Sequence, residues 1–137
     1  MRDDCLSPAL LFVEDLEQSK AFYLDVFGLR PRFEDENSAM LRFKKTMIVL
    51  LKTFAATELI GPAPVASRDA GSRIQLSIFV DDLDAVCAEL AKKDVALING
   101  PIDRPWGVRT MAFADPGGHI WEIAQDLPSA EGSAVGF

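Results

Sequence analysis

The chain has 137 residues, of which 49% are hydrophobic and 26% are charged, and its formal net charge at pH 7 is −7. A single globular domain of this size can bury a core of its own. The acidic balance argues against binding to nucleic acid or to an anionic membrane surface, because both need basic groups on the protein. Apolar runs such as residues 47–51 are too short for a membrane-spanning helix, which needs roughly 20 residues.

The cysteine and histidine content limits the chemistry further. Two cysteines, Cys5 and Cys87, do not make a disulfide framework. The first residues also lack a basic and apolar signal segment, so we expect a reduced, cytoplasmic protein. The single histidine, His119, excludes any site that takes two imidazoles from one chain.

The first half of the chain predicts a strand, a helix and three further strands. The apolar run of residues 11–13 predicts the first strand, and Asp15 behind it is typical of a helix N-cap. The helix that follows is expected to end at Gly28, which is typical of a C-cap. Alternation with a period of two then predicts strands over residues 32–35, 39–43 and 46–52.

The second half repeats this pattern after a stretch rich in Gly, Pro, Ala and Ser. That stretch, about residues 54–72, predicts a linker between modules. Residues 78–83 then resemble residues 11–16 in sequence. Asp82 is expected to be the N-cap of a helix whose apolar stripe includes Cys87. Further strands are predicted over residues 95–98, 108–114 and 119–125, and a mobile tail over residues 127–137.

The two halves together predict an α+β fold built from two βαβββ modules within one domain. The modules span about residues 7–53 and 73–126. Each helix is expected to cover one face of its sheet, so the other face must line a cavity or be buried elsewhere. We therefore predict a curved mixed sheet with a cup-shaped cavity.

Two segments carry a resemblance to a known family. These are Phe-Val-x-Asp-Leu-x-x-Ser-x-x-Phe-Tyr at residues 12–23, and Pro-Trp-Gly-Val-Arg at residues 105–109 with Asp-Pro-Gly-Gly-His-Ile-Trp-Glu at residues 115–122. They resemble the vicinal oxygen chelate superfamily, which includes glyoxalase I, bleomycin-resistance proteins, fosfomycin-resistance enzymes and extradiol dioxygenases. The bleomycin-resistance-like branch is the most similar in style. The resemblance implies the fold and leaves the function open, since metal enzymes and metal-free binders share it.

The resemblance also implies where a metal would be held. The ligands of the family come from the first and last strand of each module, which here are Gln75 and Glu122 in the second module. In the first module the equivalent positions are Pro8 and a residue near Leu50 or Leu51, and these have no donor side chain. Because a catalytic site takes three or more protein ligands, we expect no metal cofactor.

Strand alternation predicts which side chains share the cup. Gln75, Ser77 and Phe79 are expected on the cup face, because their neighbours are apolar and should face the helix, beginning with Ile74. Glu122 is expected on the same face, whereas His119 has the opposite parity and is interpreted as a turn histidine. Asp15 and Asp82 are interpreted as caps and not as catalytic acids.

The expected ligand-binding residues are mostly apolar, as in most small-molecule sites. Leu10, Phe12 and Phe79 would form the apolar wall, with Met47 or Met111 as a further contact. Trp106 would either stack on a planar ligand or cover the sheet edge. Arg109 would orient an anionic group or pair with Glu122.

We predict a homodimer that binds a small aromatic or cationic molecule in a metal-free cup, with drug sequestration as one role. The dimer is implied by the resemblance. The alternative is a lyase, isomerase or dioxygenase that uses a divalent metal held partly by Gln75 and Glu122, or acid-base catalysis by Glu122. A third reading is an accessory domain that serves dimerisation. The sequence leaves open whether any reaction is catalysed.

Overall fold

The computed structural model of the chain describes residues 6–128, which divide into two compact units. The first unit extends to Gly71 and includes Pro116–Gly118, and the second comprises Ser72–Asp115 and the chain from His119 onward. Two predictions concern residues outside this range: the reduced Cys5, and the mobile tail of residues 127–137 beyond residue 128. Within residues 6–128, no helix has both the length and the apolar character to cross a membrane.

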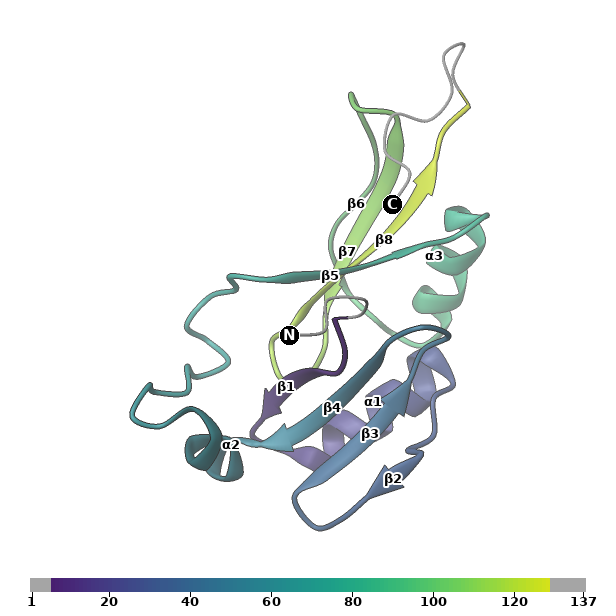
Figure 1. The fold of residues 1–137 in the computed structure, drawn as a ribbon. Coiled ribbons are helices and arrows are strands. Elements are labelled where there is room, and N and C mark those ends of the chain that lie inside the picture. Colours follow the sequence, from purple (N-terminus) through teal and green to yellow (C-terminus); the bar gives the residue numbers. More distant parts are fainter. Residues whose placement is uncertain (1–5, 129–137) are drawn as a thin grey trace. The chain divides into compact units, whose positions relative to one another are not determined.

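The first unit is a four-stranded mixed sheet with helix α1 against one face (Figure 1). Its elements are β1 (Ala9–Val13), α1 (Leu16–Phe27), β2 (Phe33–Glu34), β3 (Ser38–Arg42), β4 (Met47–Lys52) and α2 (Thr53–Ile60). The strand order is β1-β4-β3-β2, and β1 is parallel to β4. Leu11, Leu41 and Leu50 lie on one face and are at most 4% exposed, because α1 covers that face. Each such leucine contributes about 2 kcal/mol by its burial.

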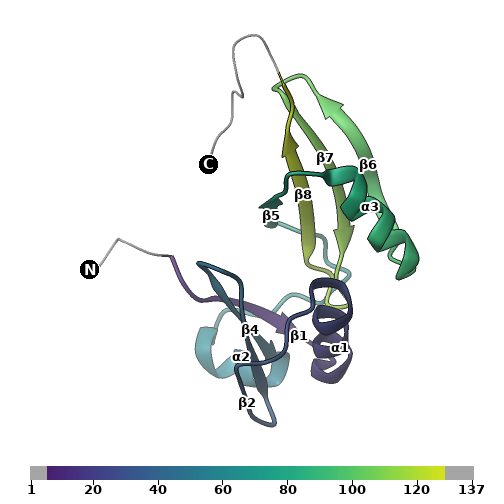
Figure 2. The same cartoon turned by 90° about the vertical axis from the view of Figure 1, so that its right-hand side faces the viewer.

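The second unit has the same order of strand, helix and three strands (Figure 2). Its elements are β5 (Gln75–Phe79), α3 (Leu83–Lys92), β6 (Leu97–Arg104), β7 (Val108–Ala114) and β8 (Ile120–Asp126). The strand order is β5-β8-β7-β6, with β5 parallel to β8. Helix α3 is tied to one face of this sheet, where Gln125 Oε1 accepts a hydrogen bond of 2.7 Å from the Leu83 backbone N–H. The predicted α+β fold of two βαβββ modules is confirmed.

The predicted caps are also confirmed. Asp15 accepts a hydrogen bond from the Gln18 backbone N–H at 3.0 Å, and Asp82 accepts one from the Ala85 N–H at 3.1 Å. Both carboxylates satisfy donors that the first helical turn leaves unpaired. Gly28 ends α1 with a φ of 69°, a backbone conformation that a residue with a Cβ adopts at a cost.

Part of the stretch predicted as a linker is helical. Helix α2 occupies its beginning and ends before Gly61, where the Gly- and Pro-rich sequence starts. Ala56 is fully buried, and the helix packs beside β1 and β4. The composition of the whole stretch did not predict this helix, because its stability comes from tertiary packing.

Strand β6 lies later in the chain than the predicted strand of residues 95–98 and passes through Gly100 and Pro101. The pairing of β6 with β7 shifts register on both sides of Asn99. Gly100 has a φ of +96°, and a Cβ there would be 2.5 Å from the carbonyl oxygen of Thr110. Bulges and the edge position of β6 let the strand accommodate residues that normally end one.

Candidate functional site

The face of the second sheet opposite α3 carries a connected set of polar side chains. Ser77 of β5 is paired with Glu122 of β8, and its hydroxyl donates a hydrogen bond of 3.0 Å to Glu122 Oε1. Gln75 Nε2 donates in turn to Ser77 Oγ at 3.3 Å. The predicted common face of Gln75, Ser77 and Glu122 is therefore confirmed. Ser77 links Gln75 to Glu122 by hydrogen bonds. Strand alternation predicted the face on which Ser77 lies but did not predict this link.

A hollow of about 320 Å³ adjoins this polar set at the beginning of β5. It is lined by Ser72, Arg73, Ile74, Gln75 and Ile120. Ile74 was expected to face the helix, and that expectation is wrong, because its side chain is 60% exposed. Ile74 precedes the first residue of β5, so the alternation of the strand does not extend to it.

Two of the predicted aromatic contacts lie in the second unit. Phe79 is paired with Ala124, two residues beyond Glu122 on β8, and is 38% exposed. Trp106 lies in the turn between β6 and β7 and is 52% exposed. Both roles expected for Trp106, stacking on a planar ligand and covering the sheet edge, are compatible with an exposed indole at a hairpin turn.

Arg109 lies on the other face of this sheet, away from Glu122. Its Nε donates to Asp103 at 2.7 Å, and its Nη1 donates to Asp84, at the start of α3, at 3.2 Å. The hydrogen bond from Arg109 holds the pKa of Asp103 below its usual value of 3.8, and the same contact raises the pKa of Arg109. Of the two roles expected for Arg109, the pairing with Glu122 is wrong, because Glu122 is opposite Ala112 and Arg109 has the opposite parity on β7. Its other expected role, orientation of an anionic group, stays a prediction.

Leu10 and Phe12 lie together in the first unit, on the face of the sheet opposite α1. Leu10 is 40% exposed and is paired with Val49 of β4. In the second unit Ser77 has the position of Leu10 and is paired with Glu122, so the counterpart of Glu122 is Val49. The expected counterpart near Leu50 or Leu51 is therefore corrected. The parallel register decides this position, and the spacing along the chain does not.

Of Met47 and Met111, the two methionines expected as further contacts, only Met47 lies on the same face of its sheet as the other expected apolar contacts. It pairs with Arg42, and its alternate neighbour Val49 faces the same side as Leu10. Met111 is fully buried in the core of the second unit and pairs with Ile123. Met111 is two residues from Arg109 on β7, so its side chain lies on the same face as Arg109 and on the opposite face from Glu122.

His119 belongs to the turn before β8. Its backbone N–H donates to Asp115 Oδ1 at 2.8 Å, and its Nδ1 lies 3.0 Å from both carboxylate oxygens of Asp115. Asp115 is 5% exposed. The pair holds the turn closed, which confirms the interpretation of His119 as a turn histidine.

The residues that could ligate a metal on this face are few. Gln75 and Glu122 supply one amide and one carboxylate, and the counterparts Pro8 and Val49 supply none. Among residues 6–128, no three or more His, Cys, Asp or Glu side chains lie close enough to hold a metal ion. This donor set does not fit a catalytic divalent metal, which normally takes three or more protein ligands.

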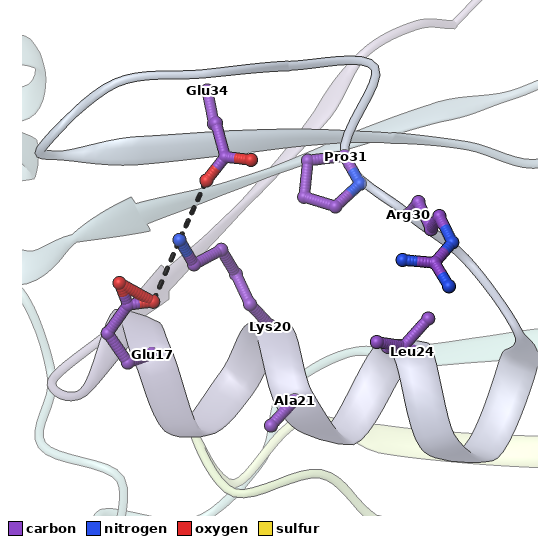
Figure 3. Close-up of a pocket in the computed structure, with 7 residues that line it drawn as sticks. All are labelled: Glu17, Lys20, Ala21, Leu24, Arg30, Pro31 and Glu34. Carbon is purple, nitrogen blue, oxygen red and sulfur yellow. Dashed lines mark hydrogen bonds and ion pairs between the residues drawn. The ribbon is translucent and has the colours of Figure 1, made fainter.

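A second hollow, of about 460 Å³, lies over α1 in the first unit (Figure 3). It is lined by Glu17, Lys20, Ala21, Leu24, Arg30, Pro31 and Glu34. Lys20 lies between two carboxylates, with its Nζ 2.8 Å from both Glu17 and Glu34, and these hydrogen bonds raise the pKa of Lys20 above its usual value. The Lys20 charge is already compensated, so we place the candidate site on the second sheet.

Comparison with known proteins finds chains that are similar in sequence and in fold. The model of the Glyoxalase/Bleomycin resistance protein/Dioxygenase superfamily matches residues 6–123. A Bacillus subtilis relative, the uncharacterized protein YraH, is 31% identical over 121 residues, which cover 85% of this chain and 94% of that protein.

Solved structures share the fold at lower identity. A glyoxalase/bleomycin resistance protein/dioxygenase from Nocardioides has a TM-score of 0.85 and 20% identity, over 100% of this chain and 91% of that one. Lactoylglutathione lyase from Agrobacterium tumefaciens has a TM-score of 0.73 and 19% identity, over 91% of this chain and 96% of that one. At these identities the likeness shows the fold alone.

Proposed function

This chain belongs to the glyoxalase/bleomycin resistance protein/dioxygenase superfamily, and we propose that within it the chain is a metal-free binding protein for a small aromatic or cationic molecule. The ligand lies on the face of the second sheet opposite α3. Glu122 contacts the cationic or hydrogen-bond-donating part of the ligand, and Phe79 contacts its apolar part.

The Glu122 carboxylate is the observation that carries this proposal. It is held by the Ser77 hydroxyl, and the ion pairs within residues 6–128 do not include it. A carboxylate that is oriented by a neutral group keeps free acceptor positions for a charged partner. Phe79 is 38% exposed on the same face, so an apolar group of a ligand gains contact area there.

A metal-dependent lyase, isomerase or dioxygenase is the competing function. The likeness to a lactoylglutathione lyase structure points in that direction through the fold alone. Gln75 and Glu122 would hold the metal in part, but the non-donor side chains of Pro8 and Val49 leave the set incomplete. We therefore favour binding over metal catalysis.

We further propose that the chain acts as a homodimer in the cytoplasm and that sequestration of a drug is one outcome of binding. The sheet edges support the dimer, because β1 and β5 are the outermost strands of their sheets. Exposed strand edges are sites where a second chain can pair. Analytical ultracentrifugation tests this, and a monomer at micromolar concentration would contradict it.

Two measurements on purified protein test the proposed function. Equilibrium dialysis against zinc, nickel, manganese and ferrous iron should give no stoichiometric uptake. Titration with aromatic amines should change the fluorescence of Trp106, and Glu122→Gln should weaken this binding about tenfold or more. Uptake of one metal per chain that Glu122→Ala removes would overturn the proposal in favour of the metal enzyme.

A further inference from the structure

Arg104 lies on the same face of the second sheet as Glu122. Its neighbour on that face of β6, Ile102, pairs with Thr110 of β7. Thr110 in turn pairs with Ala124 of β8, two residues after Glu122. Side chains two residues apart on a strand share a face, so Arg104 and Glu122 project to the same side of the sheet.

Hydrogen bonds to β6 and β7 hold the guanidinium of Arg104 on this face. Its Nε donates to Thr110 Oγ1 at 2.9 Å, and its Nη2 donates to Asn99 Oδ1 at 3.4 Å. Asn99 pairs with Ala112, which pairs with Glu122 on the next strand. Asn99, which accepts from the guanidinium, and Glu122 thus belong to one cross-strand row, and their strands β6 and β8 lie two strand spacings, or about 10 Å, apart.

Neither of these two groups has an ion-pair partner in the described part of the chain. The hydrogen-bond partners of Arg104 are the neutral oxygens of Thr110 and Asn99, and the partner of Glu122 is the Ser77 hydroxyl. The ion pairs among residues 6–128 include neither Arg104 nor Glu122. Both groups are oriented and keep their capacity for a charged ligand.

The neighbouring cross-strand row carries exposed apolar side chains at its two ends. Its two outer residues, Phe79 and Ile102, are 38% and 40% exposed, whereas the two between them, Ala124 and Thr110, are 1% and 3% exposed. Arg104 is bonded to Thr110 within this row, and Phe79 is paired with Ala124, two residues from Glu122. The exposed part of Phe79 is therefore an apolar contact close to the Glu122 end of the charged pair.

We propose that this face binds a small zwitterion with an aromatic body. Arg104 takes the anionic group, Glu122 takes the ammonium group, and Phe79 contacts the ring. This inference rests on the proposed function and specifies its ligand class. Strands β6 and β8 lie about 10 Å apart, so one small amino acid, such as a β-amino acid, can reach both groups.

Isothermal titration calorimetry with three matched probes tests the proposal. β-Phenylalanine carries both charges. The second probe, 1-phenylpropylamine (phenylpropylamine below), lacks the carboxylate, and the third, 3-phenylpropanoate (phenylpropanoate below), lacks the ammonium group. The wild type should bind β-phenylalanine at least about tenfold more tightly than either single-charge probe. A tenfold ratio corresponds to about 1.4 kcal/mol.

Variants separate the two ends of the site. Arg104→Gln should reduce the affinity for β-phenylalanine about tenfold and leave phenylpropylamine unchanged, and Arg104→Lys should restore part of the loss. Glu122→Gln should weaken both amines and leave phenylpropanoate unchanged. Arg109→Gln is the matched control, because Arg109 lies on the other face, and it should change none of the three affinities.

The outcomes distinguish this inference from the proposed function. If phenylpropylamine binds in a manner that depends on Glu122 but Arg104→Gln alters no affinity, the zwitterion site is overturned and the proposed function stands. If none of the probes binds, both are overturned. Thermal unfolding of each variant checks that a lost affinity does not reflect a lost fold.

Discussion

Replacement of Gly100 by alanine should destabilise the second unit by about 2–5 kcal/mol. The positive φ of +96° costs a residue with a Cβ about 1–2 kcal/mol. The added Cβ would also lie 2.5 Å from the Thr110 carbonyl oxygen and 2.6 Å from Met111 Cα. Both are backbone atoms, so β6 must move away from β7, and such overpacking costs about 1–3 kcal/mol more.

Gly71→Ala is a matched control for this prediction. Gly71 has a nearly identical φ of +95°, but a Cβ there would meet nothing within 4 Å. Its cost should therefore be the conformational part alone, about 1–2 kcal/mol. Urea unfolding followed by far-ultraviolet circular dichroism measures both variants, and extrapolation to water gives the two free energies of unfolding.

The difference between the two variants isolates the close approach of β6 to β7. If Gly100→Ala and Gly71→Ala have the same stability within about 0.5 kcal/mol, the steric argument is refuted. A separation of β6 from β7 would also move Arg104 from Thr110, to which it is bonded at 2.9 Å. Gly100→Ala should consequently weaken the binding of β-phenylalanine as well.

Two further predictions concern the N-cap of α3 and the ion pair between Arg109 and Asp103. Asp82→Ala should lower the free energy of unfolding by about 1 kcal/mol through loss of the N-cap, whereas Asp81→Ala, an equal change of charge, should stay within about 0.5 kcal/mol in the same urea experiment. Arg109→Gln should lower stability at neutral pH. Its difference from the wild type should shrink as the pH falls below 3.8, because Arg109 lowers the pKa of folded Asp103 from that value, and protonation of Asp103 removes the contribution. A difference that stays constant across this pH range would contradict that assignment.

Local features of the sequence were sufficient for the modules and their caps. Asp15 and Asp82 cap helices because the side chain of an N-cap bonds to the amides of the next turn, within three residues. The parity of Gln75, Ser77 and Glu122 was equally predictable, because alternation along a strand depends only on adjacent residues. The resemblance carried by residues 12–23 and 105–122 indicated the family as well.

Contacts between distant segments decided the rest. Arg104 joins the face of Glu122 because bulges near Asn99 and Gly100 extend β6 and set its register against β7. Arg109 lies on the other face because β7 pairs with β8 so that Ala112, of the opposite parity, is opposite Glu122. Val49, and not Leu50 or Leu51, is opposite Leu10 because the parallel pairing of β1 and β4 decides it. The sequence by itself determined which way each side chain points along its own strand. Only the tertiary structure decided which strands, and so which charges, lie side by side, since register depends on pairing between segments far apart in the chain.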